Sequence, residues 1–194
     1  QTVELHFALG SLFRRRGETE RAIRMHQNLV ERDDLPQDLK LQALAELGQD
    51  YLKAGLLDRA EEVFEKLRDS SMAEEAKRNL LEIYQLEKDW AKAVVIAAEL
   101  PDVATQKDIA EYYCEMAAAE MIRSKPEVAA GHLRSALERN RKCVRASLLL
   151  GDIEVQQECF AEAIACWQRI EQQDPAYLAL VAQRLLDAFR KLDR

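Results

Sequence analysis

One pattern of small and large apolar residues returns along almost the whole chain. Residues 9–29 read LGSLFRRRGETERAIRMHQNL, and residues 47–67 read LGQDYLKAGLLDRAEEVFEKL. Both contain Leu-Gly, an aromatic residue three positions after that glycine, a second glycine four positions later and an alanine five positions after it. A chain that repeats itself in this way is expected to fold as a stack of similar units, because one unit alone cannot bury its apolar face.

Looser copies continue the pattern to the end of the chain. The position of the first glycine recurs at Gly10, Gly48, Leu81, Ala117, Gly151 and Leu186. Successive members are 38, 33, 36, 34 and 35 residues apart, close to the period of about 34 residues of tetratricopeptide repeats. Each repeat is predicted to be a helix, a tight turn and an antiparallel helix. A small residue at the crossing point lets the two backbones approach closely, and apolar residues at helical spacing fill the seam.

We therefore predict an all-α fold, a right-handed superhelical solenoid of tetratricopeptide repeats that forms a single domain over 1–194. The repeats are expected at approximately 3–36, 41–74, 74–107, 110–143 and 144–177, followed by a half repeat at 178–194. Only six glycines and four prolines interrupt the chain, and all four prolines fall at predicted breaks. The third and fourth repeats lack the glycine, so an irregular helical bundle of the HEAT kind stays open as an alternative.

The sequence contains no motif that is typical of an active site or a metal site. It has three histidines and none of the H-E-x-x-H, G-x-S-x-G, Walker A or G-x-G-x-x-G motifs. Its four cysteines form no C-x-x-C pair, so we expect no metal or cofactor in this chain. The net charge of −7 argues against nucleic acid as a partner, and no apolar run is long enough to span a membrane. We predict that the chain is not an enzyme and, because it begins with Gln1 inside a helical pattern, that it is a piece of a longer protein.

A partner is expected to bind along the first helices of the repeats, which line the inner wall of such a solenoid. Projecting the repeat register gives the candidate partner-binding residues Arg14, Arg15, Gln49, Lys53, Arg78, Gln85, Met121, Ile122 and Arg145. The wall is more basic than the chain as a whole. It suits an acidic or amphipathic peptide, with arginines binding carboxylates and Met121 and Ile122 holding an apolar anchor. The alternative is a solvated wall, with the partner on the outer side or the loops.

The last helix suggests a second kind of contact. Val181, Leu185, Leu186 and Phe189 form one apolar stripe, and a half repeat has no second helix to cover it. Exposed apolar patches tend to find a partner, so we expect self-association through this C-terminal helix.

The residues between the repeat anchors carry a more specific resemblance. The segments RGETERAIRMHQ and YYCEMA, within LGSLFRRRGETERAIRMHQNLV and AEYYCEMA, resemble the repeat region of the lipopolysaccharide assembly protein B family of Gram-negative bacteria. The resemblance implies an adaptor that brings the deacetylase of the lipid A pathway to a membrane-bound AAA+ protease. It also implies cytoplasmic repeats, held at the inner membrane by an amino-terminal anchor, and a rubredoxin-like metal domain. Neither the anchor nor the paired C-x-x-C motifs occur in this chain, so membrane attachment and metal binding do not carry over to it.

Two other functions stay open. One is a generic co-chaperone or assembly scaffold that clamps carboxyl-terminal peptides, although the predicted wall lacks the asparagine that such clamps use. The other is a regulatory domain of a larger enzyme.

Overall fold

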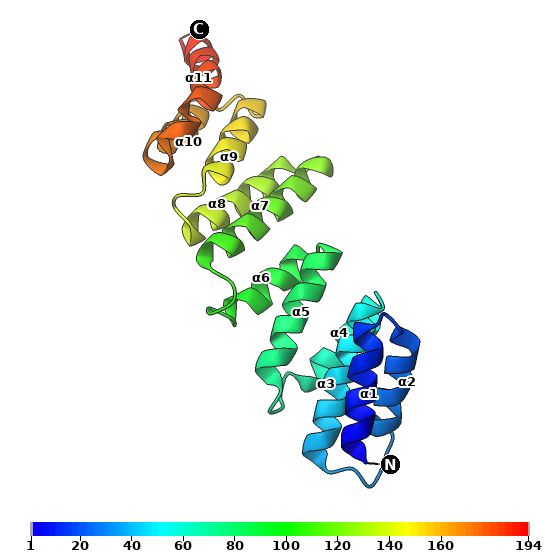
Figure 1. Ribbon diagram of the computed structural model, residues 1–194. Helices are drawn as coiled ribbons and strands as arrows, with labels where there is room; N and C mark the ends of the chain where they lie inside the picture. The colour runs from blue at the N-terminus through cyan, green and yellow to red at the C-terminus, as the bar shows by residue number, and fades with distance from the viewer. Residues whose placement is uncertain (1, 194) are drawn as a thin grey trace. The chain divides into compact units, whose positions relative to one another are not determined.

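The computed structural model describes residues 2–193, and every regular element in that range is helical (Figure 1). The chain divides into two compact units, an N-terminal unit, Gln1–Asp89, and a C-terminal unit, Trp90–Arg194. Helical hairpins build both units, because each helix is apolar on the side that meets its neighbour. The predicted all-α tetratricopeptide fold is confirmed.

The N-terminal unit contains five helices. They are α1 (Val3–Arg15), α2 (Thr19–Val30), α3 (Gln37–Lys53), α4 (Leu57–Leu67) and α5 (Ala73–Glu87). Each packs against the next along the chain, and α1 also touches α3. Helices α1, α3 and α5 are therefore the first helices of successive repeats.

The C-terminal unit begins with the second helix of the third repeat. Its elements are α6 (Trp90–Ala98), α7 (Gln106–Ile122), α8 (Pro126–Arg139), α9 (Val144–Gln156), α10 (Phe160–Gln173), the short 3-10 helix η1 (Pro175–Tyr177) and α11 (Leu178–Leu192). Helices α3 and α7 begin four residues before the starts expected for their repeats, at positions 41 and 110. In α7 the reason is local, because Thr105 and Asp108 cap the helix with reciprocal hydrogen bonds.

The same turn ends the first helix of all five complete repeats. One residue at each turn has a positive φ of 58° to 78°, in chain order Gly17, Gly55, Lys88, Ser124 and Glu158. The amide of the following residue donates to the carbonyl five positions earlier, for example from Glu18 to Phe13 at 2.9 Å. This Schellman geometry satisfies carbonyls that the helix end leaves open. Only two of the five positions hold glycine, the residue that adopts this backbone conformation at least cost.

A ring covers each glycine at the crossing points. A Cβ atom added to Gly10 would lie 2.4 Å from the His26 ring, and one added to Gly48 would lie 2.7 Å from the Phe64 ring. On Gly151 it would lie 2.2 Å from the Trp167 ring, whose indole N–H donates to the Leu148 carbonyl. The second helix thus fills with a large ring the space that the glycine leaves.

In the first, second, fourth and fifth repeats, the partner of the crossing residue lies sixteen positions later in the sequence, and its size changes in the opposite sense. Where the fourth repeat has Ala117 in place of glycine, position 133 is Leu, and both side chains belong to one buried cluster. A larger residue at the crossing is thus matched by a smaller partner than the Phe64 or Trp167 ring, as close packing requires.

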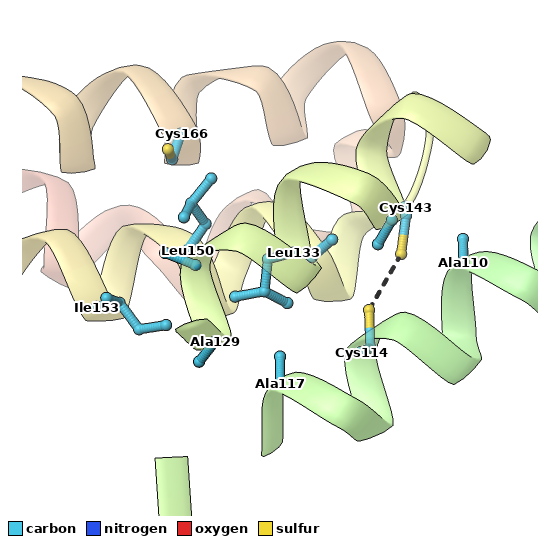
Figure 2. Packing of buried hydrophobic residues seen from close by; sticks show 12 residues of the cluster. Ala110, Cys114, Ala117, Ala129, Leu133, Cys143, Leu150, Ile153 and Cys166 are labelled. Carbon is cyan, nitrogen blue, oxygen red and sulfur yellow. Dashed lines mark hydrogen bonds between the residues drawn. The ribbon is translucent and has the colours of Figure 1, made fainter. Parts of the chain in front are cut away.

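The buried cluster between α7, α8 and α9 is built largely from alanine and cysteine. Figure 2 shows α7, α8 and α9 meeting around Ala117, Ala129, Leu133 and Leu150, with Cys114 and Cys143 side by side. Small side chains let these helices pack closely.

Candidate functional site

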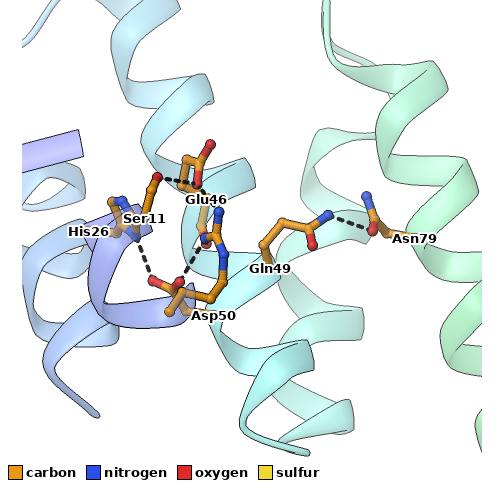
Figure 3. Close-up of polar contacts among 7 residues, drawn as sticks. Ser11, His26, Glu46, Gln49, Asp50 and Asn79 are labelled. Atoms are coloured by element: carbon orange, nitrogen blue, oxygen red, sulfur yellow. Dashed lines mark hydrogen bonds and ion pairs between the residues drawn. The ribbon is translucent and has the colours of Figure 1, made fainter. Parts of the chain in front are cut away.

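Arg14, the first of the predicted partner-binding residues, belongs to a polar cluster that joins three helices of the N-terminal unit. Figure 3 shows its partners Glu46 and Asp50 close to His26. The Arg14 guanidinium donates to Glu46 Oε2 at 2.6 Å and to Asp50 Oδ1 at 2.8 Å. The other Asp50 oxygen accepts from His26 Nδ1 at 2.5 Å, and both His26 and Asp50 are fully buried. We call Arg14, His26, Glu46 and Asp50 the Arg14 network.

The network fixes the charge of Arg14. Burial lowers the pKa of Arg14, but the hydrogen bonds to Glu46 and Asp50 outweigh burial and raise it above its usual value. A cation that is paired twice and only 21% exposed has little freedom to bind a ligand. Arg14 therefore connects α1 to α3, and its main role is structural.

Gln49 is also engaged within the unit. Its side-chain amide donates to Asn79 Oδ1 at 2.6 Å (Figure 3). Asn79 in turn donates to the Glu75 carbonyl at 2.8 Å. This contact links α3 to α5 as the Arg14 network links α1 to α3. The polar side chains of the first helices thus form a ladder across the unit.

The same arrangement recurs in the C-terminal unit. Arg145 on α9 donates to Glu115 at 2.7 Å and to Glu111 at 3.1 Å, both on α7. Arg184 on α11 donates to Asp152 on α9 at 3.0 Å. Burial lowers the pKa of Arg145, but its bonds to Glu115 and Glu111 outweigh burial and raise it. Arg145 thus joins neighbouring repeats, as Arg14 does.

Three predicted cations stand outside these pairs. Arg15, Lys53 and Arg78 are exposed on α1, α3 and α5, and within residues 2–193 none of them forms an ion pair. Gln85 is exposed on the same helix as Arg78. Among the predicted binding residues, the cations without an ion pair in the described chain therefore all lie in the N-terminal unit.

The two predicted apolar anchors, at the end of α7, differ in their exposure to solvent. Met121 packs against the buried cluster of the C-terminal unit, whereas Ile122 is 86% exposed. The first helix ends at Ile122, and Ser124 starts the turn. Of the two predicted anchors, Ile122 is therefore the one that presents an apolar surface to solvent.

The residues that the sequence projection missed are the carboxylates that pair with its arginines. Glu46 and Asp50 lie two positions before and two positions after Gly48, and Glu115, which pairs with Arg145, lies two positions before Ala117. An acidic residue close to the crossing position, about one repeat away from an arginine, could have indicated these ion pairs from the sequence. The paired carboxylates make the first helices far less basic than projected.

Two buried thiols form the remaining group of note. Cys114 Sγ and Cys143 Sγ lie 3.8 Å apart (Figure 2). The hydrogen bond between the two raises the pKa of Cys114 and lowers that of Cys143. Residues 2–193 hold no group of three side chains placed to bind a metal ion, and no helix in that range is long and apolar enough to cross a membrane.

The comparisons with known proteins agree with this architecture. Residues 5–39 and residues 115–178 match family models described as tetratricopeptide repeat. The crystal structure of MamA protein superposes with a TM-score of 0.51 at 16% identity, covering 90% of this chain and 93% of that one. At this identity the likeness concerns the fold.

Curated relatives extend over the whole chain. Lipopolysaccharide assembly protein B of Escherichia coli (strain K12) is 35% identical over 197 residues, which cover 100% of this chain and 51% of that protein. The protein of the same name from Haemophilus influenzae is 34% identical over 195 residues, covering 98% and 49%. The chain thus spans about half the length of these relatives. The resemblance seen in the sequence is confirmed: the chain belongs to the tetratricopeptide-repeat family and is, over its whole length, a relative of lipopolysaccharide assembly protein B.

Proposed function

We propose that this chain is a protein-binding adaptor whose client lies along the first helices of the N-terminal unit. The observation that carries the proposal is the division of the cations. Arg14 and Arg145 are held by carboxylates, whereas Arg15, Lys53 and Arg78 are exposed and free of ion pairs within the described chain. Cations that the fold does not use are available to a ligand.

An acidic client segment fits these three residues. Arginine presents a planar fork of donors to a carboxylate, and lysine adds a mobile point charge. Because the three side chains are exposed, their pairing with a client is screened by salt. We expect affinity to fall as ionic strength rises, and Ile122 in the other unit to offer a separate apolar contact.

The relatives suggest which client this is. We propose that the chain takes part in regulating lipopolysaccharide synthesis by presenting the deacetylase of the lipid A pathway to a membrane-bound AAA+ protease. In that role the repeats face the cytoplasm at the inner membrane, and attachment to the membrane comes from a segment outside this chain. Support comes from the identity to lipopolysaccharide assembly protein B over the whole chain and from the scaffold character of the fold.

A titration of the purified deacetylase into the 194-residue chain tests the proposal. The double variant Lys53→Glu with Arg78→Glu reverses two free cations and should weaken binding about tenfold or more, since each lost charge-assisted contact is worth on the order of a factor of ten. The control, Arg24→Glu with Lys66→Glu, makes the same charge change on the second helices α2 and α4 and should bind almost normally. Equal losses in both variants would mean that overall charge, and not this face, controls binding.

Two results would favour the other functions. A clamp for carboxyl-terminal peptides would bind short peptides that end in a free carboxylate and lose them on amidation. A regulatory domain of an enzyme would bind a catalytic partner and ignore the deacetylase.

Self-association is a separate expectation. On α11, Leu186 is 46% exposed, Phe189 43% and Leu192 50%, whereas Val181 and Ala188 are buried. We propose that a second copy of the chain covers the exposed side chains of Leu186, Phe189 and Leu192. Phe189→Glu should turn a concentration-dependent dimer into a monomer in light scattering and leave client binding intact. An unmutated chain that stays monomeric at high concentration would refute it.

A further inference from the structure

A pocket of about 660 Å³ lies between α8 and α10 in the C-terminal unit, away from the first helices. Four cations line it, Arg134, Arg141, Lys142 and Arg169, and Glu138 is its one carboxylate. The wall therefore has an excess of three positive charges, in a chain whose net charge is −7. A local charge of this sign needs an explanation, because unpaired like charges repel one another.

The fold leaves three of these cations unpaired. Arg134 reaches Glu154 at 3.2 Å and is thereby partly neutralised. Arg141, Lys142 and Arg169 are exposed, and none of them takes part in an ion pair within residues 2–193. The charges that remain open to a ligand come from the loop after α8 and from the last turns of α10.

Hydrogen bonds hold the loop in place. The Gln173 side-chain amide donates to the Arg141 carbonyl at 2.7 Å, and the Lys142 amide donates to Asn140 Oδ1 at 3.1 Å. These contacts tie the loop to the end of α10 and fix the backbone that carries two of the cations. The pocket is therefore formed before any ligand arrives, which lowers the entropic cost of binding.

Helix ends give a competing explanation for the cations. Helix α8 ends at Arg139 and α10 at Gln173, and positive charge near a helix C-terminus is stabilising. Arg139 already provides such a charge in the last turn of α8, and it does not line the pocket. Arg141 and Lys142 lie beyond the helix end, where this effect fades.

We infer that this pocket binds a terminal phosphate group, carried by a soluble molecule or by a lipid headgroup. Arginine forks match the oxygens of a doubly charged phosphate, and several cations on one compact wall suit a concentrated charge. An extended peptide is less well served, because Leu137 is the one apolar side chain in the lining and peptide grooves rely on apolar anchors. The site is independent of the client face proposed above.

Calorimetry on the whole chain tests this inference, with pyrophosphate as the soluble probe. Saturable one-to-one binding is expected, and the double variant Arg141→Gln with Arg169→Gln should weaken it about tenfold or more, since it removes two charge-assisted contacts. The control, Arg139→Gln, removes one cation from the same helix end outside the pocket and should change affinity less than about twofold, as surface charges at a distance are screened.

Sedimentation with vesicles of phosphatidylcholine, with and without phosphatidic acid, separates the two sources. Binding to phosphatidic acid vesicles that the double variant loses assigns the headgroup, whereas binding of pyrophosphate alone assigns a soluble ligand. The inference is overturned if neither probe binds, if Arg139→Gln weakens binding as much as the double variant does, or if a polyglutamate peptide displaces pyrophosphate and binds more tightly. Loss of deacetylase binding in the client-face variants leaves this result unaffected, so the two proposals fail separately.

Discussion

The two units build the same hairpin from different chemistry. In the N-terminal unit the first two repeats cross at glycine, turn at glycine, and bury the Arg14 network between them. The C-terminal unit turns at Ser124 and Glu158, both with positive φ, and packs the seam around its fourth repeat with alanine, cysteine and leucine. The comparison teaches that the repeat prescribes volumes and backbone angles, while the groups that fill the seam are free to vary. The units should therefore respond differently to substitution.

Spectroscopy can follow the two units separately. Both tryptophans, Trp90 and Trp167, lie in the C-terminal unit, so tryptophan fluorescence reports that unit, whereas circular dichroism reports both. Urea unfolding followed by the two signals tells which unit a substitution weakens.

The largest effect is expected from Asp50→Ala. This variant leaves Arg14 and the buried His26 without their shared carboxylate, and removing one partner of a buried ion pair costs about 3–5 kcal/mol. The circular dichroism transition should shift to lower urea, and the fluorescence transition should move much less.

Asp152→Ala is the matched control in the other unit. Asp152 pairs with Arg184, but both side chains are more than a third exposed, so the loss should stay below about 1 kcal/mol. Equal losses in the two variants would show that the buried network is no more important than a surface pair.

The next effect concerns the crossing in the second repeat. Gly48→Leu forces a side chain into the Phe64 ring, and overpacking of this kind costs about 1–3 kcal/mol. Adding Phe64→Ala removes the ring that the new leucine would meet and should recover most of the loss. A double variant no more stable than Gly48→Leu alone would refute the pairing of volumes.

Gly131 provides a control at which a larger side chain should raise the stability and not lower it. It lies within α8, and a Cβ added there meets nothing within 4 Å. Gly131→Ala should therefore stabilise the C-terminal unit by about 0.5–1 kcal/mol, because alanine loses less backbone entropy on folding.

A smaller effect, also stabilising, is expected at the turns of the C-terminal unit. A residue other than glycine is strained by about 1–2 kcal/mol in the left-handed region. Replacing it with glycine removes this strain, but glycine loses more backbone entropy on folding, which offsets part of the gain. Ser124→Gly should raise the fluorescence midpoint by the equivalent of about 0.5–1 kcal/mol. The reverse change, Gly17→Ser, should lower the dichroism midpoint by a similar amount, and no change in either would remove the turn as a source of difference.

The smallest effect depends on pH. In α7 the hydrogen bond from the Thr105 hydroxyl lowers the pKa of Asp108 below its usual value. A lowered pKa means that the contribution of Asp108 is complete above its unfolded-state pKa of about 3.9 and is lost as pH falls through the folded-state value.

Asp108→Asn should thus lose about 0.5 kcal/mol at neutral pH, the lower end of the worth of a cap because asparagine keeps one acceptor oxygen, and should differ less from the unmutated chain in acid. Unfolding of both proteins by urea at a series of pH values measures the difference. A gap between them that widens in acid would contradict the assignment.

Much of the fold could be read from the sequence, because glycine and alanine at a period of about 34 residues place every hairpin. The start of α7 could not be predicted from the repeat period, because it is set by the local capping box at Thr105 and Asp108. The division into two units near Asp89 was likewise invisible, as the pattern continues through it without a break.

The candidate site was harder to predict. The repeat register placed Arg14 and Arg145 on the correct helices. Their pairing with Glu46 and Glu115 could not be predicted, because it depends on how adjacent repeats stack and the sequence of one repeat does not determine that. Arg15, Lys53 and Arg78 are exposed as the projection required, and their role in binding stays a prediction.

The ring that covers each crossing glycine has a consequence for how such chains change over generations. Because the two residues lie sixteen positions apart on different helices, neither can change size alone without leaving a void or a clash. Recombination that exchanges a whole hairpin preserves the fit, whereas recombination within a turn would bring Gly48 against Leu133 or Ala117 against Phe64. The hairpin, and not the helix, is thus the smallest piece of this protein that can be inherited, duplicated or grafted intact.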